Sequence, residues 1–137
     1  METHITVRGY HTDMYQHVNN ARYLEFLEEA RWQMFEAHMD MEAFMAQGYL
    51  SFVVNINISY RSQARVNDIL IIQSGLKKIG NTSAVLGQQI VNRSTGRRCV
   101  DADVTFVISN GQGTPVKMEG EVRDALSRLP KFEGLQP

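Results

Sequence analysis

Residues 13–31 read DMYQHVNNARYLEFLEEAR, a stretch that passes from a polar loop into a long helix. Over residues 21–38 the apolar side chains recur at spacings of three and four, which is the period of an α-helix. Asn19 or Asn20 suits the N-cap, because an asparagine side chain accepts a hydrogen bond from the free N–H groups of the first turn. Apolar groups such as Trp32 extend the pattern to a second face of the helix, which indicates that a curved sheet wraps around it.

The rest of the chain is typical of strands. Residues 5–10 alternate apolar and polar side chains, as a short strand does. Four longer strands are predicted at Leu50–Arg61, Asp68–Ile79, Ser83–Arg93 and Arg97–Ser109, with short helices at 41–47 and about 119–129. The last residues, 130–137, are predicted to form a frayed tail. Because the connections are short, we expect neighbouring strands to form antiparallel hairpins. The order of elements predicts an α+β fold, one antiparallel sheet with a helix against one face.

Length and composition narrow the class of protein. A chain of 137 residues fits a single domain, here 1–137 with its core at about 5–110. The formal net charge of −1 offers no basic field to nucleic acid. Cys99 is the only cysteine, which rules out an intrachain disulfide and fits a small buried strand residue. No apolar run is long enough to span a membrane, and the amino terminus lacks a signal-peptide pattern, so we expect a cytoplasmic protein.

Titratable and polar groups are densest directly before the long helix. They are His11, Asp13, Tyr15, His17, Asn19 and Asn20. A helix amino terminus stabilises anions, so Asp13 could act as nucleophile or general base while the backbone of residues 18–20 supplies donors to an oxyanion. For these residues taken alone, a capped turn without chemistry is the favoured alternative. His17 has no partner at a ligand spacing, so neither a metal nor another cofactor is expected. No GxSxG motif supports a serine triad.

Residues 13–31 also resemble a known signature. The stretch resembles the signature of the 4-hydroxybenzoyl-CoA thioesterase-like branch of the hotdog superfamily. That signature has an Asp, then HVNN, then a Tyr and an acidic helix ending in Ala-Arg. NINISYRSQARVND (55–68) and DADVTFV (101–107) resemble the second strand and the final central strand of that family. Within the branch, residues 7–32 and 52–61 are most similar to the thioesterase III type, which acts on long-chain fatty acyl-CoA.

The resemblance implies a hotdog fold, in which a five-stranded antiparallel sheet wraps around the long helix. It gives Asp13 the position of the catalytic carboxylate, which would attack the thioester carbonyl or activate a water. A backbone N–H near Asn20 would polarise that carbonyl. His17, Asn19 and Tyr23 match the motif and would hold the loop and the pocket in shape.

Substrate features are also implied. Asn20 stands where the aryl-CoA members carry an aromatic, which favours a fatty acyl chain. Candidate pocket residues, with a simple core role as the alternative, are Leu24, Phe26, Leu27, Trp32 and Phe52. Arg61 and Arg65 flank the turn after the second strand and would bind the phosphates of coenzyme A, unless they are only solvated turn residues.

The sequence therefore predicts an enzyme that hydrolyses long-chain fatty acyl-CoA to free fatty acid and CoA. Two alternatives remain: a hotdog protein that binds acyl groups or acyl carrier protein without turnover, and a thioesterase acting on acyl carrier protein. Long strands leave exposed edges, and a second copy of the chain can cover them. We expect a homodimer as the minimum unit and a homotetramer as the assembly, with no nucleic acid or membrane partner.

Overall fold

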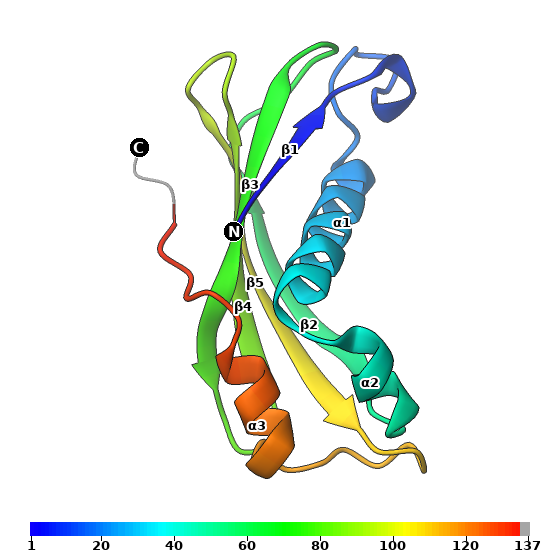
Figure 1. Cartoon of the computed structure of the whole chain (residues 1–137). Helices are drawn as coiled ribbons and strands as arrows, with labels where there is room; N and C mark the ends of the chain where they lie inside the picture. The colour runs from blue at the N-terminus through cyan, green and yellow to red at the C-terminus, as the bar shows by residue number, and fades with distance from the viewer. Residues whose placement is uncertain (135–137) are drawn as a thin grey trace.

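The computed structural model describes residues 1–134 and confirms the predicted α+β hotdog architecture (Figure 1). The strands are β1 (Glu2–Thr6), β2 (Leu50–Tyr60), β3 (Ile69–Ile79), β4 (Ala84–Asn92) and β5 (Arg98–Ser109). The helices are η1 (Gly9–His11, a single 3-10 turn), α1 (Asn20–His38), α2 (Met41–Ala46) and α3 (Gly120–Ser127). The sheet curves behind α1, while α2 and α3 lie near the end of the sheet opposite the start of α1. No helix within residues 1–134 is both long and apolar enough to cross a membrane.

The five strands form one antiparallel sheet in the order β1-β3-β4-β5-β2. Hairpins join β3 to β4 and β4 to β5, as predicted. The expected hairpin between β2 and β3 is wrong, because β2 pairs with β5 at the opposite edge, with Tyr60 opposite Val100. The connection over residues 61–68 instead crosses the end of the sheet, where the Ser62 hydroxyl donates to the Arg98 carbonyl at 2.7 Å.

Both ends of the chain differ from the prediction. The first strand spans Glu2–Thr6 rather than residues 5–10, because η1 turns the backbone away at Gly9. The region after α3 was expected to fray, yet Phe132 donates its N–H to the Leu76 carbonyl at 2.9 Å. A Cβ at Gly87 would come within 2.5 Å of the Phe132 ring, so this glycine leaves room for the ring on the sheet. Residues 135–137 of the predicted tail lie outside the described part.

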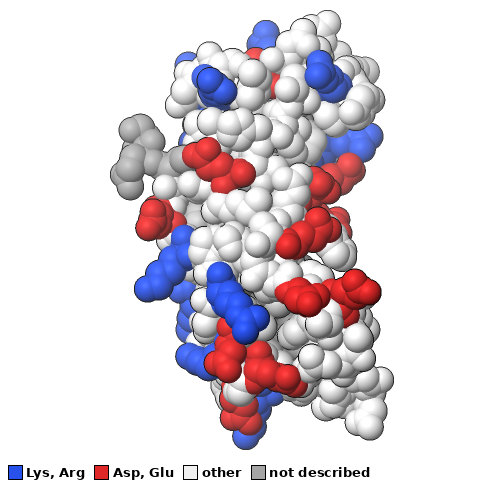
Figure 2. Space-filling view, in the orientation of Figure 1, with Lys and Arg blue, Asp and Glu red and all other residues white. Residues whose placement is uncertain are grey.

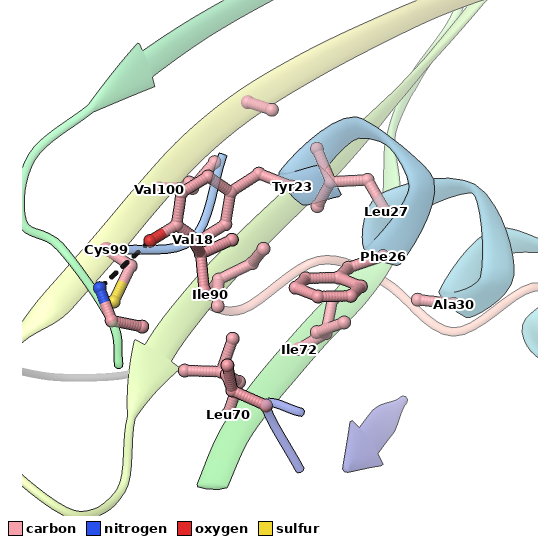
Figure 3. Close-up of a cluster of buried hydrophobic side chains, with 13 residues drawn as sticks. Val18, Tyr23, Phe26, Leu27, Ala30, Leu70, Ile72, Ile90, Cys99 and Val100 are labelled. Atoms are coloured by element: carbon pink, nitrogen blue, oxygen red, sulfur yellow. Dashed lines mark hydrogen bonds between the residues drawn. The ribbon is translucent and has the colours of Figure 1, made fainter. Parts of the chain in front are cut away.

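One stripe of α1 is buried against the sheet. It comprises Tyr23, Phe26, Leu27, Ala30 and Met34. Figure 3 shows most of this stripe facing apolar side chains of β3, β4 and β5. Leu24 belongs to the apolar pattern of the helix but lies outside this buried stripe and is 37% exposed. The buried stripe fixes the height and rotation of α1 above the sheet.

The two edges of the sheet are protected unequally. The outer edge of β3 is covered by β1 and then by the segment around Phe132. Along the outer edge of β2 no strand pairs within residues 1–134. Phe52, Val53 and Val54 of β2 are 49%, 43% and 57% exposed. A long, apolar and unpaired edge is a surface that another strand can extend.

Candidate active site

The loop before α1 is a tight, internally bonded turn. Thr12 and Val18 form an antiparallel bridge, and the Asp13 N–H donates to the His17 carbonyl at 3.0 Å. The Gln16 N–H donates to the Asp13 carbonyl at 3.0 Å, and Gln16 adopts a φ of 64° to close the turn. The backbone therefore presents Asp13 at the tip of a defined structure and not on a free loop.

The carboxylate of Asp13 is oriented but open. Its Oδ1 accepts the Tyr15 N–H at 2.9 Å, which fixes the rotamer. Its other oxygen has no partner within residues 1–134, and the side chain is exposed. Met14 and Tyr15, which follow it, are 85% and 73% exposed. A carboxylate fixed by one oxygen and free at the other is suited to attack a carbonyl or to take a proton from water.

The first turn of α1 leaves one backbone donor free. Asn19, one of the two predicted candidates, is the N-cap, and its Oδ1 accepts the Ala21 N–H at 2.9 Å. The Arg22 N–H donates to the Asn19 carbonyl at 2.8 Å. Among the described residues the N–H of Asn20 has no hydrogen-bond partner, and Asn20 is exposed. This is a donor at the positive end of the helix dipole, which is the arrangement that stabilises an oxyanion.

Tyr23 joins α1 to the connection that follows β2. Its hydroxyl accepts the Ala64 N–H at 3.1 Å, the bond drawn in Figure 3. The Ala64 carbonyl in turn accepts the Val18 N–H at 2.9 Å. Burial raises the pKa of Tyr23 to about 12, so the hydroxyl is neutral at ordinary pH. Through Ala64, both the loop and the first turn of α1 are tied to the end of the sheet.

His17 and Tyr60 complete the surroundings of the helix start. The backbone of His17 forms an antiparallel bridge with that of Arg65, which ties the loop to the β2–β3 connection. Tyr60, at the end of β2, donates its hydroxyl to the Asn20 carbonyl at 3.4 Å. Local sequence does not single out Tyr60, since only the register of β2 against β5 brings it beside α1. The one sequence feature that includes Tyr60 is the Tyr-Arg pair at residues 60–61, which resembles part of the family's second strand.

Arginines gather at the end of the molecule that carries Asp13. The upper end of Figure 2 shows basic side chains, whereas acidic ones lie over α1. The arginines placed at this end by the strand termini and by the first turn of α1 are Arg8, Arg22, Arg61, Arg65, Arg93, Arg97 and Arg98.

The two arginines predicted to bind CoA differ in their surroundings. The Nε of Arg61 bonds the carboxylate of Asp101, which also accepts from Gln89 at 2.8 Å. Although its partial burial alone would raise the pKa of Asp101, these bonds hold that pKa below its usual value. Arg65 is exposed, and its guanidinium has no ion pair within residues 1–134. Of the two, Arg65 is the one available to an anionic ligand.

The predicted acyl-pocket residues separate into three groups. Phe26 and Leu27 belong to the core under α1. Leu24 of α1 and Phe52 of β2 are partly exposed. Trp32 lines an apolar cavity between α1, α2 and β2. Within residues 1–134 no three His, Cys, Asp or Glu side chains are grouped as a metal site would need.

Comparison with known proteins adds family information to this geometry. Residues 7–126 match the family model described as the thioesterase-like superfamily. The chain is 46% identical over 132 residues to the long-chain acyl-CoA thioesterase FadM of Escherichia coli strain K12, covering 96% of this chain and 100% of that one.

Solved structures give the same picture of the fold. The crystal structure of YbaW, a probable thioesterase from Escherichia coli, superposes with a TM-score of 0.89 at 45% identity, covering 96% of this chain and 99% of that one. A 1,4-dihydroxy-2-naphthoyl-CoA thioesterase from Synechocystis superposes with a TM-score of 0.79 at 14% identity, covering 92% and 94% of the two chains. This second likeness concerns the fold alone.

We predict that Tyr23→Phe lowers the free energy of unfolding by about 1–3 kcal/mol, because the buried Ala64 N–H loses its acceptor without a change in packing. Urea unfolding followed by circular dichroism measures the loss. Tyr10→Phe, a change at a 72% exposed tyrosine, is the matched control and should leave stability within about 0.5 kcal/mol of wild type. Equal stability of Tyr23→Phe and wild type would contradict the role given to this bond.

Proposed function

Because the chain belongs to the thioesterase-like superfamily, we propose that it hydrolyses long-chain fatty acyl-CoA to a free fatty acid and CoA, with Asp13 as the catalytic carboxylate. The observation that carries the proposal is the pairing of two groups on one short segment. Within residues 1–134, Asp13 has a carboxylate oxygen free for chemistry, and Asn20 has a backbone N–H free to bind a carbonyl oxygen. The 46% identity to a long-chain acyl-CoA thioesterase supports the choice of substrate.

The reaction follows from these two groups. The thioester carbonyl accepts a hydrogen bond from the Asn20 N–H, and the dipole of α1 stabilises the negative charge that develops on its oxygen. Asp13 either attacks the carbonyl carbon, forming an anhydride that water then hydrolyses, or removes a proton from the attacking water. In both routes the carbon–sulfur bond breaks, and the CoA thiolate leaves and takes up a proton. The fatty acid departs as a carboxylate.

Coenzyme A is recognised at the same end of the molecule. Its phosphates are placed at Arg65, whose guanidinium is exposed, while Arg61 keeps its ion pair with Asp101. The carboxylates of Glu25 and Glu28 on the exposed side of α1 would repel a phosphate, so the arginine-rich end of the sheet is the favoured approach.

A second copy of the chain completes the site. Asp13 is exposed in the single chain, although a hydrolytic carboxylate works best where water is controlled. The unpaired edge of β2 ends at Tyr60, directly beside the start of α1. Antiparallel pairing of β2 with the same strand of a second copy would cover Phe52 and Val54 and bring the copy over the site. The further step to a homotetramer stays a prediction.

We expect Asp13→Asn and Asp13→Ala to lower kcat/KM for palmitoyl-CoA by about a hundredfold or more, because each removes the attacking or proton-accepting oxygen. Release of free thiol measures turnover, and thermal unfolding should show no large loss of stability. Asp124→Asn, an exposed carboxylate on α3, is the control and should retain wild-type turnover. Full activity in both Asp13 variants would refute the catalytic role. Tight binding of palmitoyl-CoA without turnover by wild type would favour the non-catalytic binding alternative.

The dimer proposal predicts that Val54→Lys produces a monomer with greatly reduced turnover, because a charged side chain on the open edge opposes strand pairing. Sedimentation analysis measures the mass and the thiol assay measures activity. Val66→Lys changes a valine of similar exposure, 40%, in the β2–β3 connection and should remain dimeric and active. A wild-type protein that sediments as an active monomer would exclude the proposed assembly.

A further inference from the structure

An apolar cavity lies at the end of α1 remote from Asp13. Its volume is about 190 Å³, and α1, α2 and the beginning of β2 each contribute a wall. The apolar lining includes Trp32 and Phe35 from α1, Phe44 and Met45 from α2, and Leu50 and Val53 from β2. The catalytic chemistry proposed above uses none of these residues.

The lining is largely apolar and partly open to solvent. Trp32, Met45, Leu50 and Val53 are 46%, 50%, 44% and 43% exposed. Apolar side chains gathered around a concave opening gain from covering by an apolar ligand. The walls therefore suit an alkyl group better than a polar one.

The lining also contains two charged residues: Glu28, which is exposed, and Arg31, whose guanidinium is bonded to a side chain of the sheet. Arg31 donates from Nη1 to Oε1 of Gln88 at 3.0 Å, and Gln88 is 1% exposed. The amide nitrogen of Gln88 donates to the Leu27 carbonyl and to the Ser74 hydroxyl, each at 2.9 Å. With its guanidinium held by Gln88, Arg31 lends its aliphatic stem to the cavity wall.

The cavity and the start of α1 are joined by two elements that run side by side. Tyr60 of β2 contacts Asn20 at one end, and Leu50 of β2 lines the cavity with Trp32 at the other. Figure 1 shows β2 passing beside α1 over this length. A ligand lying along α1 and β2 would reach from the free Asn20 N–H to the cavity.

The length of that path matches a long acyl chain. Trp32 lies twelve residues after Asn20 in α1, and a rise of about 1.5 Å per residue gives about 18 Å between them. An extended hydrocarbon advances about 1.25 Å per carbon, as bonds of about 1.5 Å at tetrahedral angles require. A chain of about 14 carbons spans the distance when its carbonyl is at Asn20, by the same lengths. Shorter chains end before the cavity.

We propose that this cavity receives the methyl end of the acyl chain and that its α2 wall, Phe44 and Met45, limits the chain length accepted. The inference rests on the proposed acyl-CoA hydrolysis and adds to it the residues that determine length specificity. Long chains gain contacts with the cavity that short chains cannot make, so selectivity for long chains follows from binding their distal carbons.

The first test fills the cavity. Met45→Trp should lower kcat/KM for palmitoyl-CoA by about tenfold or more while octanoyl-CoA changes by less than about twofold, because only the long chain reaches the added ring. Ala46→Trp places the same bulk at the next position of α2, outside the lining, and should keep the wild-type preference. An unchanged ratio of palmitoyl-CoA to octanoyl-CoA turnover in a folded Met45→Trp protein would overturn the inference.

The second test does not depend on turnover or on a mutation in α2. Trp32 is the only tryptophan of the chain, so intrinsic fluorescence reports on the cavity. In the Asp13→Asn variant, palmitoyl-CoA should shift the emission to shorter wavelength, whereas octanoyl-CoA should not. Equal responses to both ligands, or no response to palmitoyl-CoA at saturation, would place the chain elsewhere.

The two proposals fail in different ways. If wild type hydrolyses no acyl-CoA, the proposed function fails, and a Trp32 response to palmitoyl-CoA would still identify an acyl-binding cavity. If wild type hydrolyses palmitoyl-CoA but neither Met45→Trp nor the Trp32 emission discriminates chain length, the function stands and the cavity assignment fails.

Discussion

The backbone of Ala64 is the point on which the site depends. Its N–H donates to the buried Tyr23 hydroxyl, and its carbonyl accepts the Val18 N–H, so one residue of the β2–β3 connection holds both the loop and the first turn of α1. The apolar stripe of α1 sets how the helix rests on the sheet, but it does not fix the residues before the helix. The two bonds to Ala64 do so, because a buried polar group held on both sides is costly to move. These two bonds therefore determine the position of Asp13.

Bonds within the segment before α1 and in its first turn explain how it combines a free carboxylate oxygen with a free amide N–H. The Asn19 side chain caps the Ala21 N–H, which leaves the Asn20 N–H without a partner in the described chain. Asp13 uses one oxygen to bind Tyr15, which leaves the other open. The structural bonds of this segment therefore leave one carboxylate oxygen and one amide N–H available, so the fold itself prepares the site. The open edge of β2, next to the start of α1, is where a second copy would shield it.

Much of this could be predicted from local sequence. The Asn19 cap, the extent of the long helix and the positions of four strands follow from residue type and periodicity, and the DMYQHVNN segment located the polar loop. The placement of β2 beside β5 could not, because local patterns do not encode which distant strand pairs with which. For the same reason the contact of Tyr60 with Asn20 and the ion pair that occupies Arg61 appeared only in three dimensions. The docking of Phe132 depends on Gly87, whose missing side chain gives no periodic signal.

The central claim is that Asp13 and the Asn20 N–H act on one thioester carbonyl. The most direct measurement is a crystal structure of Asp13→Asn with uncleaved palmitoyl-CoA bound. The account predicts the carbonyl oxygen within about 3 Å of the Asn20 nitrogen, and the side chain of residue 13 within about 3.5 Å of the carbonyl carbon. A thioester bound away from the start of α1, with the Asn20 N–H bonded to water, would contradict it.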